Sequence, residues 1–276
     1  MNFKIVRRGL GENRKYFYKG FEGSLCGEGY DEACAFDGEY AKVKKYGEWY
    51  YVSQKEFAKT GSSHLYKYDK FQEDYNVVYE NGKYYFIDED GNMRGEGYVE
   101  AYAFSEGYAI VKKDGKYYFV DKDLNFKGEG YDDAYAFSEG YAQVKKDDKE
   151  FYVSKKEFER TGSSRFYKFK KFQEGFNIFY DNGKYYFIDK DLNFKGEGYD
   201  DAYAFSEGFA IVKKDNLWFF VDKAFTLLGE GYDSIYGCDK GYAKVEKAGK
   251  KFYVSQEEFA KTGSSHFYKY KGLQEG

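Results

Sequence analysis

The sequence predicts an all-β protein made of eight tandem repeats of about 33 to 35 residues, each a β-hairpin within a three-stranded meander. Three observations lead to this prediction: one hairpin pattern recurs along the chain, aromatic residues make up 23% of the 276 residues, and glycine is abundant (32) while proline is absent. Aromatic rings pack well on a pleated surface, and glycine with Asp or Asn builds tight turns without proline. The composition therefore favours strands over helices.

The repeat period is read from two landmarks. Gly-Glu-Gly-Tyr begins at Gly27, Gly95, Gly128, Gly196 and Gly229, and Thr-Gly-Ser-Ser takes its place at Thr60, Thr161 and Thr262, which are 101 residues apart. The repeats open at Phe3, Phe36, Phe71, Phe104, Phe137, Phe172, Phe205 and Cys238, and Leu273 would open a ninth. These steps are 33 or 35 residues. We assign the two extra residues to the Thr-Gly-Ser-Ser connector, which is then expected to be a loop.

One repeat shows the hairpin in detail. Asp114-Gly115 is a two-residue turn signal, because a type I′ turn needs positive φ at both central residues. Pairing outward from this turn places Val111 opposite Tyr118 and Ala109 opposite Val120. Side chains alternate along a strand, so these four residues share one face, which is the expected core face.

A third short strand is expected upstream of each hairpin, as in residues 131–137, followed by the turn Ser138-Glu139-Gly140. One such repeat cannot offset its ordering entropy, so neighbouring repeats must stack. We expect a single array over 1–276, with 101-residue blocks at 36–136 and 137–237 and partial repeats at 1–35 and 238–276. An open superhelical solenoid is preferred, and a closed eight-bladed, propeller-like ring whose terminal halves complete one blade is the alternative.

Charge and cysteine content exclude several classes of protein. The 44 basic and 48 acidic residues give a net charge of −4 without long runs of one sign, which argues against nucleic-acid binding. No apolar run is long enough to span a membrane. The N-terminus lacks a signal-peptide pattern and the three cysteines do not recur with the repeat, so a cytoplasmic protein is expected. An exported protein whose signal peptide was removed is the alternative.

Residues 104–116 and their copy at 137–149 resemble the bacterial WG repeat, in which F-x-(E/D)-G-x-A-x-V precedes a turn and a Trp-Gly pair. Here Tyr-Tyr-Phe or Trp-Tyr-Tyr stands in place of that pair. The resemblance implies an all-β repeat protein with no catalytic residues to carry over. Residues 81–92 are also similar to choline- and glucan-binding repeats, although those repeats are shorter and use paired tryptophans.

The aromatic triplet of the second hairpin strand provides the candidate ligand surface. The Tyr118 and Phe119 positions are aromatic in every repeat, so one is expected in the core and the other against a neighbouring repeat or connector. The Tyr117 position also holds Glu150 and Lys251, so it is expected to reach water. The candidate ligand residues at this position are Tyr16, Trp49, Tyr84, Tyr117, Tyr185 and Trp218.

The connectors are the places where repeats differ, and their variable residues are Thr60 with His64, Thr161 with Arg165, and Thr262 with His266. No second metal ligand or nucleophile recurs beside the histidines, so they are expected to be exposed polar loop residues, with no metal or cofactor. Residues 88–92 faintly resemble a calcium loop, but an Asx-type turn explains them. The glutamates of Gly-Glu-Gly (Glu28, Glu96, Glu129, Glu197 and Glu230) are expected at turns, paired with lysines such as Lys113.

No enzyme is expected. The sequence favours a protein-binding or scaffolding module with an unidentified protein partner, because repeat stacks offer long surfaces. Glycan or cell-envelope binding through the Tyr117-type row is the alternative, and a self-assembling structural protein is the third possibility.

Overall fold

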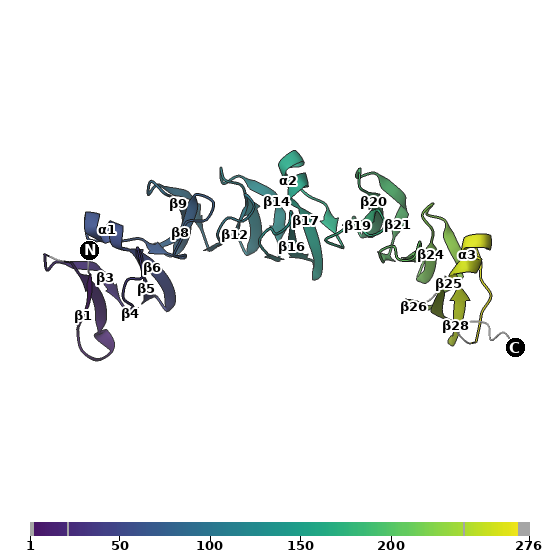
Figure 1. Cartoon of the computed structure of the whole chain (residues 1–276), viewed down its shortest axis with the longest axis horizontal. Coiled ribbons are helices and arrows are strands. Elements are labelled where there is room, and N and C mark those ends of the chain that lie inside the picture. Colours follow the sequence, from purple (N-terminus) through teal and green to yellow (C-terminus); the bar gives the residue numbers. More distant parts are fainter. Residues whose placement is uncertain (1–2, 21, 240, 270–276) are drawn as a thin grey trace. The chain divides into compact units, whose positions relative to one another are not determined.

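The computed structural model describes residues 3–20, 22–239 and 241–269 (Figure 1). In these residues the protein is all-β, as predicted, apart from three α-helices and one short 3-10 turn, η1 (Gly11–Asn13). The chain divides into two compact units, Met1–Asp148 and Lys149–Gly276, which are described separately. A single array over 1–276 stays a prediction, and Leu273 lies outside the described residues.

Each repeat contains two long strands, which a tight turn joins in every repeat except the first, where residues 9–14 with η1 lie between them. In the first compact unit the first strands are β1 (Lys4–Arg8), β5 (Tyr40–Lys45), β8 (Tyr75–Glu80), β12 (Ala109–Lys113) and β16 (Tyr141–Lys146), and the second strands are β2 (Lys15–Lys19), β6 (Glu48–Ser53), β9 (Lys83–Asp88) and β13 (Lys116–Val120). The second compact unit holds β17 (Lys149–Ser154), then β19 (Phe176–Asp181) with β20 (Lys184–Asp189), β23 (Ala210–Lys214) with β24 (Leu217–Val221), and β27 (Tyr242–Lys247) with β28 (Lys250–Ser255).

The predicted hairpin register is confirmed. Val111 faces Tyr118, and Ala109 faces Val120. Asp114 and Gly115 both have positive φ (49° and 77°), as a type I′ turn requires.

A short strand precedes each hairpin after the first, as predicted, and a further strand comes after most hairpins. These short strands are β4 (Glu32–Ala33), β7 (Leu65–Tyr66), β11 (Glu100–Ala101) and β15 (Asp133–Ala134), then β18 (Phe166–Tyr167), β22 (Asp201–Ala202) and the longer β26 (Ser234–Asp239). The following strands are β3 (Leu25–Tyr30), β10 (Met93–Tyr98) and β14 (Phe126–Tyr131), then β21 (Phe194–Tyr199) and β25 (Leu227–Tyr232). A complete meander therefore has a fourth strand that was not predicted from the sequence.

The Gly-Glu-Gly segments lie in these following strands, so the prediction that their glutamates occupy turns is wrong. The expected lysine partners are confirmed: Glu28 pairs with Lys45, Glu96 with Lys113, Glu129 with Lys146, Glu197 with Lys214 and Glu230 with Lys247. Glycine is needed because the bulged strand passes close to the aromatic ring of the Tyr118 position. A Cβ on Gly130 would lie 2.8 Å from the Tyr118 hydroxyl.

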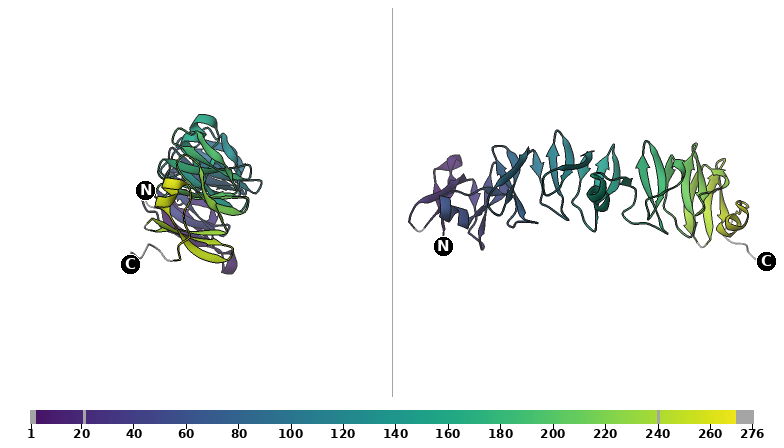
Figure 2. Two further views of the ribbon diagram at one scale, coloured as in Figure 1. Left: turned by 90° about the vertical axis from the view of Figure 1, so that its right-hand side faces the viewer. Right: turned by 90° about the horizontal axis from the view of Figure 1, so that it is seen from above.

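The strands form open antiparallel sheets (Figure 2). The strand orders in the first compact unit are β1-β2-β3, β10-β9-β8-β7-β6-β5-β4, β11-β12-β13-β14 and β15-β16. Those in the second are β17-β18-β19-β20-β21, β22-β23-β24-β25 and β26-β27-β28.

The connectors are helical, so the prediction of loops is wrong. The helices are α1 (Gln54–Thr60), α2 (Lys155–Thr161) and α3 (Gln256–Thr262). The Ser53 side chain accepts the Glu56 N–H at the start of α1, and Gly61 ends the helix with φ 76°. Because α1 replaces a following strand, the open side of β6 pairs with β7, through Tyr51 and Tyr66.

The two extra residues of the long repeats do not lie in the connector either. Val52 and Val120 hold equivalent places in the second hairpin strand, and Leu65 and Asp133 hold equivalent places in the next short strand. The number of residues from Val52 to Leu65 equals the number from Val120 to Asp133. The insertion therefore falls between Lys67 and Phe71.

A buried asparagine compensates for this insertion. The Asn76 side chain donates to the Tyr68 carbonyl (2.9 Å), and its own carbonyl accepts the Val77 N–H (2.7 Å). Asn177 makes the same pair of bonds with Phe169 and Ile178. The repeats without the insertion have alanine at this position, except the first, which has Lys4.

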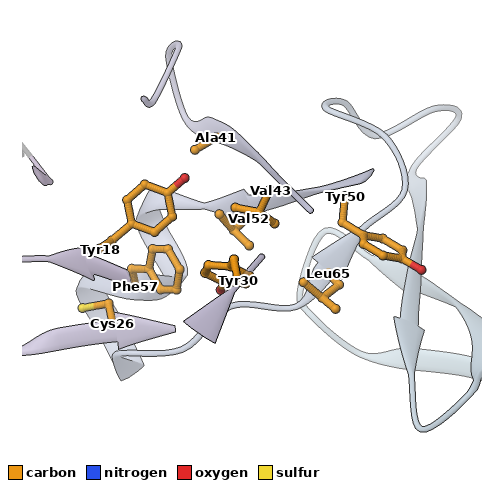
Figure 3. Packing of buried hydrophobic residues seen from close by; sticks show 9 residues of the cluster. All are labelled: Tyr18, Cys26, Tyr30, Ala41, Val43, Tyr50, Val52, Phe57 and Leu65. Carbon is orange, nitrogen blue, oxygen red and sulfur yellow. The ribbon is translucent and has the colours of Figure 1, made fainter. Parts of the chain in front are cut away.

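Aromatic rings fill the core between repeats. Phe119 is fully buried and lies 4.9 Å from Phe137, which opens the next repeat. In the first repeats, Tyr18 and Phe57 of α1 lie 5.4 Å apart in a cluster that also holds Tyr30 (Figure 3). The helical connector thus contributes to the core.

Side-chain hydrogen bonds also join successive repeats. Glu73 accepts the Gly107 N–H (2.8 Å), and Glu106 accepts the Gly140 N–H (2.9 Å). In the second compact unit Glu174 accepts the Gly208 N–H (3.1 Å). The glutamate of each such turn therefore binds the equivalent turn of the next repeat.

Candidate functional site

The predicted ligand residues lie on the second hairpin strands, but most are only partly accessible. Trp49 is 38% exposed, whereas Tyr185 is only 9% exposed. The other four, Tyr16, Tyr84, Tyr117 and Trp218, are half-buried.

Lysine ammonium groups lie over the rings of five of these six residues. Lys42 lies 5.2 Å from the Trp49 ring centre, Lys67 lies 5.1 Å from Tyr84, Lys112 lies 4.7 Å from Tyr117, Lys168 lies 4.8 Å from Tyr185 and Lys213 lies 5.6 Å from Trp218. Aromatic rings pack beside three of them, Tyr79 beside Tyr84 (5.1 Å), Tyr180 beside Tyr185 (5.0 Å) and Tyr203 beside Trp218 (5.7 Å). The rings thus hold the protein's own cations by cation–π attraction, which leaves less open face for a ligand.

A second set of side chains, called the edge row here, is more exposed. It consists of the residues that come directly after the pairing of the short strand with the first hairpin strand: Cys34, Lys67, Tyr102 and Tyr135 in the first compact unit, and Lys168, Tyr203 and Tyr236 in the second. Except at Tyr236, the backbone N–H donates to a carbonyl of the first hairpin strand, as from Tyr102 to Ile110 (2.9 Å). Tyr236 follows Ile235, which pairs with Val245 as Ala134 pairs with Val144. The members therefore hold one register position.

The tyrosines of the edge row are 37% (Tyr102), 57% (Tyr135), 47% (Tyr203) and 54% (Tyr236) exposed. Lys67 lies 4.0 Å from the ring centre of Tyr102, and Lys168 lies 4.6 Å from that of Tyr203. Burial lowers the pKa of Lys67 below its usual value, against the attraction of Glu100 and Glu48. This row was not predicted from the sequence, although Ala-Tyr-Ala-Phe recurs at 101–104, 134–137 and 202–205.

The connector threonines terminate the helices. The Thr60 hydroxyl donates to the Glu56 and Ser62 carbonyls (both 3.0 Å). Thr161 and Thr262 make the equivalent bonds. These residues therefore stabilise the helix end.

Each connector also contains a glutamate that was not predicted from the sequence. The Glu56 carboxylate accepts the Ser63 hydroxyl (2.7 Å), the His64 N–H (2.9 Å), His64 Nδ1 (2.7 Å) and the Tyr66 hydroxyl (2.8 Å). Glu258 collects the same set from Ser265, His266 and Tyr268, and Glu157 accepts from Ser164 and Arg165. The pattern Ser53-x-x-Glu56, a helix capping signal, could have identified it.

These contacts shift the ionisation of the connector groups. Burial opposes the charge of Glu56, but hydrogen bonds from His64, Ser63 and Tyr66 outweigh it and lower its pKa to about 2. The hydrogen bond to Glu56 raises the pKa of His64, against burial. His64 is therefore a half-buried, partnered side chain rather than the exposed loop residue that was predicted, whereas His266 is exposed.

Neither a metal cluster nor a membrane-spanning helix is present in the described residues. Among residues 3–20, 22–239 and 241–269, no three His, Cys, Asp or Glu side chains are grouped so that they could hold a metal ion. No helix within that part of the chain is long and apolar enough to cross a membrane.

The fold and the connectors define a tandem β-repeat protein. A family described as "WG containing repeat" matches residues 86–117, 130–149 and 198–218. The chain carries WG repeats at these three places, which confirms the resemblance read from residues 104–116 and 137–149. No curated protein matches the chain.

Solved structures give low-similarity matches. PorZ, described as an essential bacterial surface component of the type-IX secretion system of Porphyromonas gingivalis, matches with 9% identity and a TM-score of 0.31, over 90% of this chain and 39% of that one. The AfRom2 CNH domain matches with 9% identity and a TM-score of 0.27, over 79% and 91%. Kluyveromyces lactis Hsv2 matches with 11% identity and a TM-score of 0.28, over 75% and 82%. The chain spans about two fifths of the PorZ chain.

Proposed function

We propose that this chain is a non-catalytic repeat protein that binds another protein through the edge row. The main support is the exposure of Tyr102, Tyr135, Tyr203 and Tyr236 at one register position. Tyrosine is enriched at protein interfaces because it brings a large apolar ring and a hydroxyl with few rotatable bonds. Lys67 and Lys168 add a cation beside this surface in each compact unit.

The connectors support a non-catalytic role. A His–Glu pair resembles part of a catalytic relay, but the middle copy places Arg165 on Glu157 instead. Arginine does not release a proton in proteins and cannot serve as a general base. The cation at this position therefore works as a charge partner for the glutamate.

Glycan binding, the alternative from the sequence, needs an aromatic face that a sugar can stack upon. The Trp218 ring already has Tyr203 at 5.7 Å and Lys213 at 5.6 Å. These neighbours favour the protein-binding proposal. Quenching of tryptophan fluorescence by a panel of soluble glycans would reverse this preference.

A crosslinked pull-down from the native cell tests the proposal with matched variants. In one variant Tyr102, Tyr135, Tyr203 and Tyr236 are changed to serine. The control changes Tyr46 and Val99 to serine, because both are exposed (64% and 63%) but lie outside the edge row. We expect the wild type and the control to enrich the same protein and the edge-row variant to lose it.

The proposal is wrong if the edge-row variant captures that protein as efficiently as the wild type. Far-ultraviolet circular dichroism must show that all three proteins keep their strand signal. Sedimentation of the purified chain alone measures whether the chain self-associates, which would support the third possibility, a self-assembling structural protein.

A further inference from the structure

The middle connector differs from the first one at several neighbouring positions. The two copies are compared at positions 101 residues apart. The first copy has Lys59, His64, Leu65, Val78 and Met93, and the middle copy has Arg160, Arg165, Phe166, Phe179 and Phe194 in their places. Each of these five changes introduces an arginine or a phenylalanine. The helix, its glutamate and the serines are retained in both copies, although Gln54 and Ala58 of the first helix are Lys155 and Glu159 in the second.

The changed residues surround one hollow. A pocket of about 400 Å³ is lined by all five of them, together with the connector residues Glu157, Thr161, Ser163 and Ser164 and the adjoining Tyr180 and Asp181. A volume of this size accommodates a small ligand or one or two side chains of a peptide. All of these residues belong to the second compact unit.

Aromatic rings and arginine stack within the pocket. The Arg165 guanidinium lies 5.7 Å from the Phe179 ring centre and 5.8 Å from that of Phe194. The two rings lie 4.9 Å apart, and Phe194 is 58% exposed. The guanidinium is therefore fixed in orientation beside an open apolar surface, which reduces the entropy lost when it binds a ligand.

The accessible charge of the pocket is positive on one side. Glu157 has only 5% of its side chain exposed, and its carboxylate already accepts Ser164 Oγ (3.0 Å), the Arg165 N–H (2.8 Å) and an Arg165 guanidinium N–H. The Arg165 side chain is 32% exposed and has further N–H donors. Within the part of the chain that the structure describes, Arg160 forms no ion pair. Asp181 is the remaining acid of the lining.

We propose that this pocket binds an acidic peptide segment of a partner protein. A partner carboxylate lies against Arg160 and Arg165, and an adjacent aromatic or aliphatic side chain packs on Phe194. Planar guanidinium groups recognise carboxylates through paired hydrogen bonds, and Arg160 and Arg165 supply such donors in the pocket lining. The pocket lining contains no residue of the edge row, so a negative result for this proposal leaves the proposed function to its own test.

Fluorescence anisotropy with the full chain tests the proposal. The probe is a short labelled peptide in which glutamate and phenylalanine alternate. Two control peptides replace either every glutamate by glutamine or every phenylalanine by serine. We expect saturable binding of the probe that weakens with added salt, and at least about tenfold weaker binding of each control peptide.

Variants based on the first connector provide the matched protein control. R165H, R160K and F194M each introduce the residue that the first copy has, so the helix and its glutamate should still form. We expect R165H at pH 8, and the triple variant, to weaken probe binding by about tenfold or more. The edge-row variant should bind the probe as the wild type does.

Two results would overturn the proposal. One is the absence of saturable binding by the wild type up to about 1 mM probe, the weak limit of specific recognition. The other is equal affinity of the triple variant and the wild type, with thermal unfolding showing that both are folded. Equal binding of the glutamine peptide would count against carboxylate recognition in the same way.

Discussion

At the scale of single residues, the structure explains an irregularity in the core. Asn76 and Asn177 are almost fully buried at a position that is alanine in five other repeats. Each one hydrogen-bonds a carbonyl in the segment that contains the two-residue insertion. A buried polar side chain is tolerated here because both ends of its amide have partners.

Replacing Asn76 by alanine should therefore destabilise the protein, although alanine is the usual residue at this position. The Tyr68 carbonyl and the Val77 N–H would each lose a partner, at a cost of about 1–3 kcal/mol. Urea unfolding measures the loss. The reciprocal change, A109N, should also be destabilising, because that repeat has no inserted carbonyl for the amide. A neutral N76A variant would contradict this explanation.

The connector histidine should make stability depend on pH. The pKa of His64 is raised in the folded state, so its contribution is fully present below the usual value of 6.5 and is lost as pH rises through the higher folded value. H64R, which copies the middle connector, should lose less stability over this range. Unfolding free energies of both proteins from pH 6 to 9 provide the test, and parallel profiles would contradict it.

The Glu56 carboxylate predicts a second loss of stability in acid. Its folded pKa is about 2, below the usual value, so its contribution is present above about 4.5 and declines as pH falls towards 2. E56Q should flatten the acid side of the stability profile. An unchanged acid limb in E56Q, measured by urea unfolding between pH 2 and 5, would show that other carboxylates dominate.

At the scale of secondary structure, the connector helices show where a sequence argument based on periodicity fails. The residue-by-residue pairing of the hairpin strands could be predicted, because the turn Asp114-Gly115 fixes the pairing of Val111 with Tyr118. The seven-residue helix α1 was not, since it buries mainly Phe57 and has too few residues for a helical period to stand out. Its capping residues, Ser53, Glu56 and Gly61, carried the signal instead.

The helix caps differ in a way that mutation can test. Ser53 caps α1 through its side chain, whereas Ser154 makes no side-chain cap bond at α2. S53A should cost about 1 kcal/mol, and S154A less. Thermal unfolding of the two single variants compares them directly, and equal losses would mean that the cap bond is not the cause.

At the scale of the whole molecule, stability should depend on contacts between successive repeats. Asp132 shows the pattern, because it binds Lys116 of one hairpin and the Asp147 N–H (2.8 Å) in the turn of the next. The positions of the edge row and of the lysines over the rings could not be read from the sequence. For Lys67 and Lys168 the position depends on where the insertion lies, which the strand pairing of the structure reveals.

Removing one of these bonds should loosen the junction between two repeats. E106A leaves the Gly140 N–H without its acceptor and should cost about 1 kcal/mol. Hydrogen exchange at the Gly140 amide should accelerate. E129Q, which removes a partly exposed ion pair with Lys146, should change stability less. Unchanged exchange at Gly140 in E106A would contradict this role.

The helical and the strand-forming connectors have equal length, so one could replace the other between two hairpins. Either segment leaves the hairpin at the Val52 or Val120 position and rejoins the sheet at the Leu65 or Asp133 position. Exchanging one for the other would decide whether a sheet continues or stops at that point without shifting the register of the next hairpin. Such a chain can vary the length of its sheets by recombining copies of its own segments.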